Sequence, residues 1–389
     1  MAIQVGGTTV VSNTRGLNNI ASVDATTVTT LSNAGVGASP FQYDTVSGTT
    51  QALDVGSHNF FDAGTLTADT TVSFSNVPTE ARWTYTAETG TTGYELENAT
   101  YVRDISVKSL EDVPLGLFFK PDGTVMYITG FDRIIYEYSL STAWDITTAS
   151  YVRGFNVGSQ ETYPSGIFFK ADGTKMYMCG FAADYVNEYS LSTAWNISTT
   201  SYVRRFSVAS QGVNPKGVFF KPDGTVMYVA SQDSAVWEYS LSTAWNVSTA
   251  SYVRTLDTTA QETDVCGVSV KSDGTALFII GANDTVFEYS LSTAWNVSTA
   301  SYVKGFSVAD YETNAQDLFF TPDGTDMYIT GSLGDRVVQY QTAGATPISF
   351  PSSVQNPPTE TLSGGAQVSY TFFTADGGTT VKLINEEVL

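Results

Sequence analysis

The amino-acid sequence predicts an all-β protein organised around a five-bladed β-propeller. Two repeated motifs support this prediction. The phrase SLSTAW occurs four times and a turn motif ending in DGT occurs five times, both at intervals of about 50 residues along the 389-residue chain. Repeats of this length are typical of solenoids, propellers and other arrays, and they are far longer than the heptad of a coiled coil.

A Tyr-Val pair opens each repeat and gives the number of units. Within a unit, four short runs rich in β-branched and aromatic residues indicate strands, and the uncharged second run, GIFF in the second copy, is the expected innermost strand. Four antiparallel strands per unit without helices favour a propeller. The rival parallel β-helix has shorter coils and no hairpin turn in each repeat. The five units begin at Tyr101, Tyr151, Tyr202, Tyr252 and Tyr302.

The segments KPDGT, KADGT, KSDGT and TPDGT connect the second and third strands of the units. Pro presets φ for a turn, Asp accepts hydrogen bonds within it, and Gly adopts the positive φ that closes the hairpin. We therefore assign the repeated carboxylates to turn formation and not to metal binding. They are Asp122, Asp172, Asp223, Asp273 and Asp323.

The SLSTAW motif ends the third strand and begins the connection to the outer strand. A buried Trp covers a large apolar area and ties its N–H to an acceptor. We therefore expect each indole to seal the seam between two blades and to donate to a loop carbonyl, and we favour this over a sugar-binding platform. The residues are Trp144, Trp195, Trp245 and Trp295.

The two ends of the array predict how the ring closes. The fifth unit stops near Gln341 without an STAWN segment. Tyr94 stands seven residues before Tyr101, which is also the spacing between Trp144 and Tyr151. The chain before the first unit is therefore expected to supply the outer strand of the last blade, which brings the ends of the array together.

The regions outside the propeller predict one further domain. Residues 59–86 and residues 346–388 each contain about three strands with alternating patterns. Three strands alone seldom form a stable sandwich, whereas six or seven can. We therefore expect both flanks to form one small, jelly-roll-like β-sandwich that contains the propeller as an insertion. The expected domains are an N-terminal segment (1–57), the first part of the sandwich (58–90), the propeller (91–343) and the second part of the sandwich (344–389).

The N-terminal segment predicts an attachment element. IQVGGTTVV is typical of a short hairpin, and Asp24 caps an expected small helix over residues 25–33. The apolar side of that helix is too narrow to hold a domain, so we expect it to dock on other proteins or to form a homo-oligomer such as a trimer. A frayed leader is the alternative.

Composition excludes several classes of partner. The chain has 18 basic and 39 acidic residues and a formal net charge of −21, whereas nucleic-acid binding needs a basic surface. An anionic bilayer would repel it, no apolar run is long enough to span a membrane, and no export signal opens the chain, so we expect synthesis in a cytoplasm. Cys179 and Cys266 occupy non-equivalent positions and are expected to be buried thiols without a disulfide.

The flanking strands resemble a known family. TLTADTTVSFSNVP, followed downstream by ISFPSSV and FFTADGGTTVKLI, is similar to a small all-β module of bacteriophage tail-fibre and other virion surface proteins. This chain departs from that family by the roughly 250 residues between the two parts, and by Val381-Lys382 where an aromatic pair often stands. The matching residues are Thr70, Thr71, Phe74, Asn76, Pro78, Phe350, Pro351, Phe372, Phe373, Asp376, Gly377, Gly378 and Thr379.

Two further resemblances point in the same direction. The opening MAIQVGGTTVVSNTRGLNN resembles that of structural proteins of phages that infect marine bacteria, and the propeller units resemble the YVTN- and PDGT-type repeats of bacterial and phage surface propellers. Residues 36–56 match no family. Together the resemblances imply a protein of the virion surface.

A repeated set of acids is the strongest candidate for a binding site. Five Asp residues precede the strands that contain Glu-Tyr or its equivalent, and three Glu residues precede inner strands. Such an acidic rim suits calcium, which prefers several oxygen ligands, or a polyhydroxylated sugar. We favour the alternative that the Asp side chains accept backbone N–H bonds in their own turns. The acidic rim consists of Asp132, Asp184, Asp233, Asp284, Asp335, Glu161, Glu262 and Glu312.

The sequence contains few of the residues and motifs that enzyme active sites need. His58 is the only histidine, which disfavours Ser/His/Asp catalysis and a multi-histidine zinc site, and no Gly-rich phosphate loop opens a helix. A glycosidase needs a specific pair of carboxylates, whereas Asp264, Arg133 and Arg336 are the main polar breaks in the repeat pattern. We name no catalytic residue, and no cofactor other than the Ca²⁺ that the acidic rim could accept.

The sequence therefore favours a non-enzymatic structural protein of a phage particle, either a tail fibre or a capsid-surface appendage or decoration. The expected partners are other virion proteins at the N-terminal segment and a host-surface glycan or protein at the propeller, without nucleic acid or membrane insertion. The alternatives are a virion-associated carbohydrate-active enzyme on a propeller scaffold and a ligand-free spacer.

Overall fold

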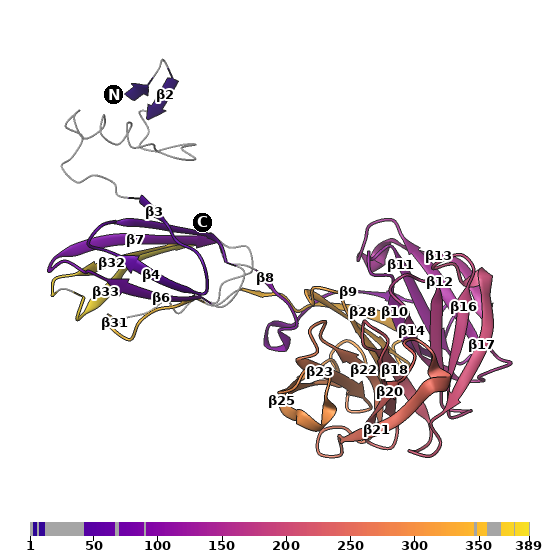
Figure 1. The fold of residues 1–389 in the computed structure, drawn as a ribbon. Coiled ribbons are helices and arrows are strands. Elements are labelled where there is room, and N and C mark those ends of the chain that lie inside the picture. Colours follow the sequence, from indigo (N-terminus) through magenta and orange to yellow (C-terminus); the bar gives the residue numbers. More distant parts are fainter. Residues whose placement is uncertain are drawn as a thin grey trace. The chain divides into compact units, whose positions relative to one another are not determined.

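The chain forms two compact units. A computed structural model describes residues 3–5, 8–11, 43–66, 70–88, 91–345, 348–355, 367–376 and 378–388. The helices in these ranges are five 3₁₀ helices of three residues, and none of them is long enough to cross a membrane. The units are Met1–Gly90 with Ala345–Leu389, and Thr91–Gly344 (Figure 1).

The second unit is a five-bladed β-propeller, as the sequence predicts. Each blade is a sheet of four antiparallel strands. In blade order, the strands are β10 (Pro114–Phe119), β11 (Val125–Gly130), β12 (Ile134–Leu140) and β13 (Ala149–Asn156); β14 (Pro164–Phe169), β15 (Lys175–Gly180), β16 (Tyr185–Leu191) and β17 (Thr200–Ser207); β18 (Pro215–Phe220), β19 (Val226–Ser231), β20 (Ala235–Leu241) and β21 (Ala250–Asp257); β22 (Val265–Val270), β23 (Ala276–Gly281), β24 (Thr285–Leu291) and β25 (Ala300–Ser307); β26 (Ala315–Phe320), β27 (Asp326–Gly331), β28 (Arg336–Gln341) and β9 (Thr100–Ser106). The 3₁₀ helices before the outer strands are η1 (Leu96–Asn98), η2 (Ile146–Thr148), η3 (Ile197–Thr199), η4 (Val247–Thr249) and η5 (Val297–Thr299).

The GIFF-type strands are innermost, as predicted. The first strand of every blade packs against the first strands of both neighbouring blades. A Cβ atom at Gly116 would collide with the carbonyl oxygen of Ser165 in the next blade, and one at Gly166 would crowd the backbone of Lys216 in the same way. The close approach of neighbouring backbones around the axis therefore explains the glycine in these strands.

β9 closes the ring, which confirms the prediction from the ends of the array. It precedes the first blade in sequence, yet it pairs with β28 of the fifth blade, with Tyr101 opposite Tyr340 and Thr100 opposite Gln341. In every blade the outer strand therefore belongs to the next sequence repeat. Beside the closure, β8 (Thr91–Thr92) pairs with β29 (Gly344–Ala345), so the chain enters and leaves the propeller side by side.

The two repeated motifs meet in one contact at each seam between blades. Trp195 donates its backbone N–H to the carbonyl of Gly173 (3.0 Å), and its indole covers this glycine so closely that a Cβ atom would collide with it. Gly173 also has φ +71°, so the DGT turn requires glycine for two reasons. The indole stacks on Phe118 of the preceding blade, and the carbonyl of Trp195 accepts a hydrogen bond from the hydroxyl of Tyr127 in that blade.

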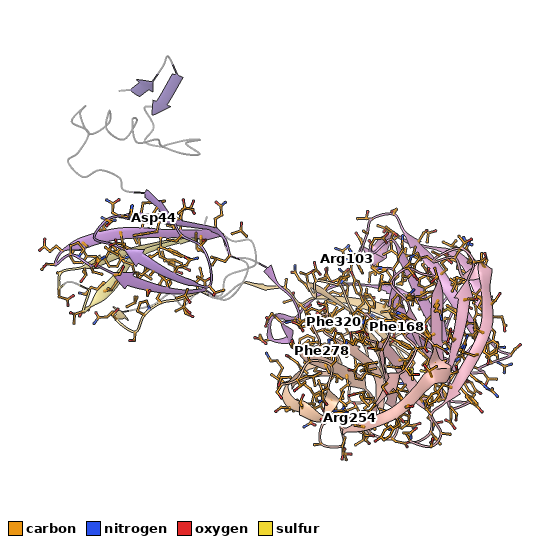
Figure 2. All side chains as sticks on the ribbon, viewed as in Figure 1. Asp44, Arg103, Phe168, Arg254, Phe278 and Phe320 are labelled. Atoms are coloured by element: carbon orange, nitrogen blue, oxygen red, sulfur yellow. The ribbon has the colours of Figure 1, made fainter. Side chains whose placement is uncertain are left out.

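The same contact recurs around the ring. At the fourth seam Tyr94 replaces the Trp. Its ring stacks on Phe278 (centroids 5.8 Å apart) and packs at a tilt against Phe320 (5.0 Å), and Figure 2 labels both Phe residues. The hydrogen bond that crosses each of the other seams involves the backbone carbonyl of the Trp, whereas we expected the indole N–H. The further acceptor and donor pairs are Trp245 and Tyr177, Trp295 and Tyr228, and Trp144 and Tyr328.

The seam contact predicts an unusual order of stability for two variants. Trp195 has φ +66°, a left-handed conformation that costs a non-glycine residue about 1 kcal/mol. Trp195→Ala should lower the free energy of unfolding by about 3–5 kcal/mol, because the packing is lost. Trp195→Gly loses the same packing but relieves the strain, so it should be at least as stable as the Ala variant. Urea denaturation followed by circular dichroism compares the two, and a less stable Gly variant would contradict this account.

Asn187 in β16 supports a second prediction. Its side chain is fully buried, and within the described propeller neither its amide nitrogen nor its oxygen has a hydrogen-bond partner. An unpaired buried amide costs about 1–3 kcal/mol, so the nearly isosteric Asn187→Leu should raise the melting temperature. An unchanged or lower value would show that the amide is satisfied. The equivalent residues of the other blades are Tyr136, Trp237, Phe287 and Val338.

The first unit contains two sheets that share one core. Strands from both sides of the propeller pair directly, with Trp83 opposite Phe372. The core includes Leu53, Phe61 and Tyr85 with these two residues. The six-stranded sheet has the order β3 (Tyr43–Thr45), β5 (Phe60–Thr65), β7 (Ala81–Glu88), β32 (Gln367–Thr374), β33 (Val381–Val388) and β31 (Val354–Gln355), and the three-stranded sheet has the order β30 (Ile348–Ser349), β6 (Thr70–Ser75) and β4 (Thr50–Asp54).

Two expectations about this unit were wrong. Strands β3 and β4 belong to these sheets and Leu53 lies in their core, so the boundary expected at residue 57 is too late. Pairs such as β4 with β6 and β5 with β7 are parallel, whereas a jelly roll is antiparallel. In the N-terminal segment, β1 (Ile3–Val5) and β2 (Thr8–Val11) pair antiparallel, and the helix expected over residues 25–33 lies outside the described residues.

Candidate functional site

The two ends of the propeller differ in what they carry. The DGT turns, the Trp segments and the points where the chain enters and leaves lie at one end, which we call the turn face. Near the exit, Thr342 donates its N–H to Thr325 beside the fifth DGT turn, and Glu95 near the entry donates to Thr342. The opposite end, the loop face, consists of the turns between the second and third strands of each blade and the loops that lead into the inner strands. The loop face therefore carries no connection to the rest of the chain.

Buried glutamates hold the loops of the loop face in place through hydrogen bonds to backbone N–H groups. Each lies in a loop before an inner strand and accepts backbone N–H bonds. Glu262 accepts from Asp264 in its own loop (2.9 Å) and from Asn283 in the turn of the same blade (2.9 Å). We call these residues the staple glutamates: Glu111, Glu161, Glu262 and Glu312.

The staple glutamates correct the predicted acidic rim. Glu161, Glu262 and Glu312 are at most 1% exposed, so they are not surface ligands for calcium or sugar. Burial raises the pKa of Glu312 to about 7, although the N–H of Gly334 opposes this, and burial also raises the pKa of Glu161. The sequence analysis missed Glu111, the equivalent residue of the first blade. These carboxylates serve to fix the loops.

The third blade replaces the staple glutamate with a different residue pair. Gly212 takes the glutamate position, and the carboxylate of Asp233 accepts the N–H of Val213 in the loop (2.9 Å). A Cβ atom at Gly212 would collide with this carboxylate. Asp233, which we assigned to the rim, is therefore a structural substitute for the missing glutamate.

The five rim Asp residues are not equivalent, so they do not form a symmetric ring. Asp132 and Asp233 stand one position earlier in their turns than the other three. The last position of the turn has a φ between +49° and +70°, which Asp tolerates better than most residues, so backbone geometry explains part of the recurrence. That position is occupied by Arg133, Asp184, Ser234, Asp284 and Asp335.

The rim carboxylates are engaged in contacts with the protein. Asp184 and Asp284 accept backbone N–H bonds from the next blade at the start of its inner strand, at 2.8 and 2.9 Å, and not from their own turns as we expected. Asp132 accepts the hydroxyl of Tyr136, and Asp335 forms an ion pair with Lys108. Within the ranges that the structure describes, no group of three or more His, Cys, Asp or Glu side chains is arranged to hold a metal ion.

The DGT carboxylates follow turn chemistry. Asp172 accepts the N–H (3.0 Å) and the hydroxyl (2.6 Å) of Thr174, and it forms an ion pair with Lys170. Partial burial opposes ionisation, yet these contacts lower the pKa of Asp172 to about 2. The same Thr N–H bond is made by Asp122, Asp223, Asp273 and Asp323.

A single carboxyl breaks the symmetry at the axis. Asp317 of the fifth blade stands where the other four blades have the axial glycine, and it is buried. Its oxygens accept the N–H groups of Leu117 in the first blade and of Leu318, both at 2.9 Å. Burial, which these two bonds oppose, raises the pKa of Asp317 to about 8.

A polar contact lies at the end of the axis nearest the loop face. Lys216 forms an ion pair with Asp264 (2.6 Å), and its Nζ lies 3.5 Å from the Sγ of Cys266. Burial raises the pKa of the Cys266 thiol to about 12, although Lys216 opposes this, so the thiol is not activated as a nucleophile. Both Cys179 and Cys266 are buried and free, as predicted.

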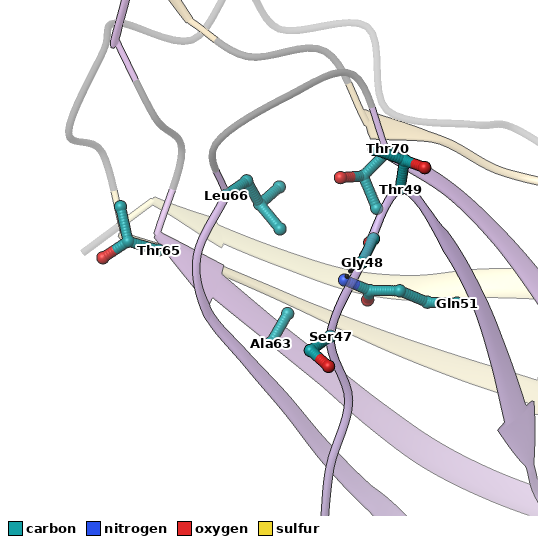
Figure 3. Close-up of a pocket in the computed structure, with 8 residues that line it drawn as sticks. All are labelled: Ser47, Gly48, Thr49, Gln51, Ala63, Thr65, Leu66 and Thr70. Carbon is teal, nitrogen blue, oxygen red and sulfur yellow. Dashed lines mark hydrogen bonds between the residues drawn. The ribbon is translucent and has the colours of Figure 1, made fainter.

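Two cavities lie among the described residues. The axial cavity, about 200 Å³, is lined mainly by apolar residues, and Asp317 also lines it. Four blades contribute an equivalent Phe, and the fourth blade contributes Ser269 instead: the aromatic residues are Phe118, Phe168, Phe219 and Phe319. The second, about 180 Å³, lies in the first unit beside Gln51 (Figure 3). The amide of Gln51 is already occupied, because it donates to the carbonyl of Gly48 and accepts from the hydroxyl of Tyr85.

An exposed aromatic patch on the loop face escaped the sequence analysis. Phe131 and Tyr163 are each 40% exposed, and their ring centroids lie 5.0 Å apart. Phe181 packs against both, at 5.7 and 5.4 Å. Comparison of equivalent positions in the repeats would have revealed the patch. Phe131 and Phe181 correspond to Gln232, Ala282 and Ser332, and Tyr163 corresponds to Val113, Asn214, Asp264 and Asn314.

Asp317 predicts a distinctive pH dependence. Between about pH 4 and pH 8 its carboxyl keeps a proton in the folded chain and loses it in the unfolded chain, so the free energy of unfolding should fall as the pH rises. Asp317→Asn should remove this part of the slope, at a cost of about 1 kcal/mol for a lost hydrogen bond. Urea denaturation of both proteins at several pH values measures it, and equal slopes would contradict the assignment.

Comparison with known proteins does not add a function to the geometry described above. No family model and no curated protein matches the chain. Among solved structures, the chain is similar to a functionally unknown protein from Desulfotomaculum acetoxidans, with 15% sequence identity and a TM-score of 0.40, over 61% of this chain and 74% of that one.

Proposed function

We propose that this chain is a structural appendage of a bacteriophage particle, either a tail fibre or a capsid-surface fibre or decoration, whose propeller contacts the host surface. The resemblance of the flanking strands and the repeats to virion surface proteins supports this function. The observation that carries the proposal is the position of the chain connections. Because entry and exit lie together at the turn face, no chain connection interrupts the loop face, which offers a surface for contact with a partner.

In this proposal, the first unit is a β-sandwich that contains the propeller as an insertion. Support comes from the pairing of β7, which precedes the propeller, with β32, which follows it, and from the core that the two sheets share. The N-terminal segment attaches the sandwich to other virion proteins or to copies of itself, for example as a trimer. The net charge of −21 suits a protein that stays soluble and avoids nucleic acid.

Electron microscopy and adsorption assays test this function. An antibody against the propeller should label the surface of intact particles of the phage that encodes the chain, and purified chain should compete with those particles for adsorption to host cells. Antibody absorbed beforehand with purified chain is the control. Intact particles that carry no label would contradict the proposal.

Two other outcomes would support the alternative functions. Label on the particles without competition for adsorption would favour a ligand-free spacer. Shortening of purified host polysaccharide during incubation with the chain would favour a carbohydrate-active enzyme.

A further inference from the structure

We propose that the aromatic patch of Phe131, Tyr163 and Phe181 binds neutral sugar residues of a surface glycan. This inference rests on the proposed function and names the receptor chemistry for the loop face. The patch combines turn residues from the first and second blades with the inner-strand loop of the second blade. It therefore spans one seam of the ring at the end that carries no chain connection.

The fold does not require these aromatic side chains. The third, fourth and fifth blades have small or polar residues at the equivalent positions and still form the same four-stranded sheets. The aromatic residues at the seams are retained because they are buried between blades. Phe131 and Tyr163 instead leave 40% of their surface exposed, and clustered exposed apolar residues commonly mark binding sites.

The size of the patch favours a sugar over a protein partner. A Phe or Tyr side chain offers roughly 150–250 Å², so 40% exposure leaves roughly 60–100 Å² on each of the two most exposed rings. A stable protein interface needs about 800 Å² from each partner. The patch is far smaller than this, and it matches the apolar C–H face of one or two pyranose rings. Sugars present such a face to aromatic rings while their hydroxyl groups remain at the edge.

The charges near the patch favour a neutral sugar. Asp132 directly follows Phe131 and is itself followed by Arg133, so the nearest charges in the sequence balance. The whole chain has a net charge of −21, so an anionic glycan would be repelled. Asp132 is exposed and a carboxylate has more acceptor sites than its bond from Tyr136 uses, so it can also accept from a sugar hydroxyl group at the edge of the patch.

Glycan binding by the full chain tests the inference. Purified protein is applied to an array of neutral di- to hexasaccharides together with sialylated and sulfated ones, and the best ligand is titrated by calorimetry. At least one neutral oligosaccharide should bind. The double variant Phe131→Ala/Tyr163→Ala should weaken that binding by about tenfold or more, and Tyr163→Phe should largely retain it.

A matched control tests whether binding depends on the patch itself or on any exposed aromatic side chain. Tyr202→Ala removes a Tyr of similar exposure, 43%, from the outer strand of the same blade, and it should leave glycan binding unchanged. Equal melting temperatures of the variants and the unmodified chain would show that the fold is intact.

Several results would overturn the inference. These are the absence of binding to any neutral oligosaccharide, equal binding by the double variant, or attachment to host cells that survives periodate oxidation of their glycans but is lost after protease treatment. The labelling of intact particles does not depend on the patch. Labelled particles without sugar binding would therefore reject the sugar site alone, whereas sugar binding by a chain absent from particles would reject the appendage alone.

Discussion

The pairing of β9 with β28 is the constraint on which the rest of the propeller depends. Five separate sheets around an axis leave an exposed strand edge wherever the ring stays open, and such edges are prone to pair with other chains. Here a strand made before the first blade completes the last one. Because β9 begins at the turn face and ends at the loop face, the entry has to lie beside the exit near Gly344. The closure is therefore the reason that no chain connection lies at the loop face.

Residues that differ from the repeat pattern help to distinguish positions that serve the fold from positions that serve recognition. At some positions, a second substitution nearby compensates for the first. At the fourth seam Tyr94 replaces Trp where Phe278 replaces the donor Tyr, and in the third blade Gly212 replaces a staple glutamate where Asp233 supplies the carboxylate. Such paired changes preserve a contact, so they need no functional explanation. The aromatic patch has no compensating partner within the fold, and this is why it, and not the acidic rim, is the better candidate for recognition.

The blade count, the turns and the ring closure could be predicted because each depends on local chemistry that the sequence repeats. The burial of Glu161 and Glu262 could not, since nothing in a single loop shows that a carboxylate turns inward to accept backbone N–H bonds. Strand β4 was missed because it pairs in parallel with β6, so no hairpin turn in the sequence marks the pair. The patch was missed because its residues lie in separate loops, and only the ring brings them together.

The most direct test of the account is amide hydrogen exchange of β9 in the full-length chain. If β9 is the outer strand of the fifth blade, its amides should be protected to the same degree as those of the other outer strands, β13, β17, β21 and β25, because they make the same ladder of hydrogen bonds. Exchange of β9 amides as fast as that of the exposed loop-face turns would show that the ring is open and would contradict the account.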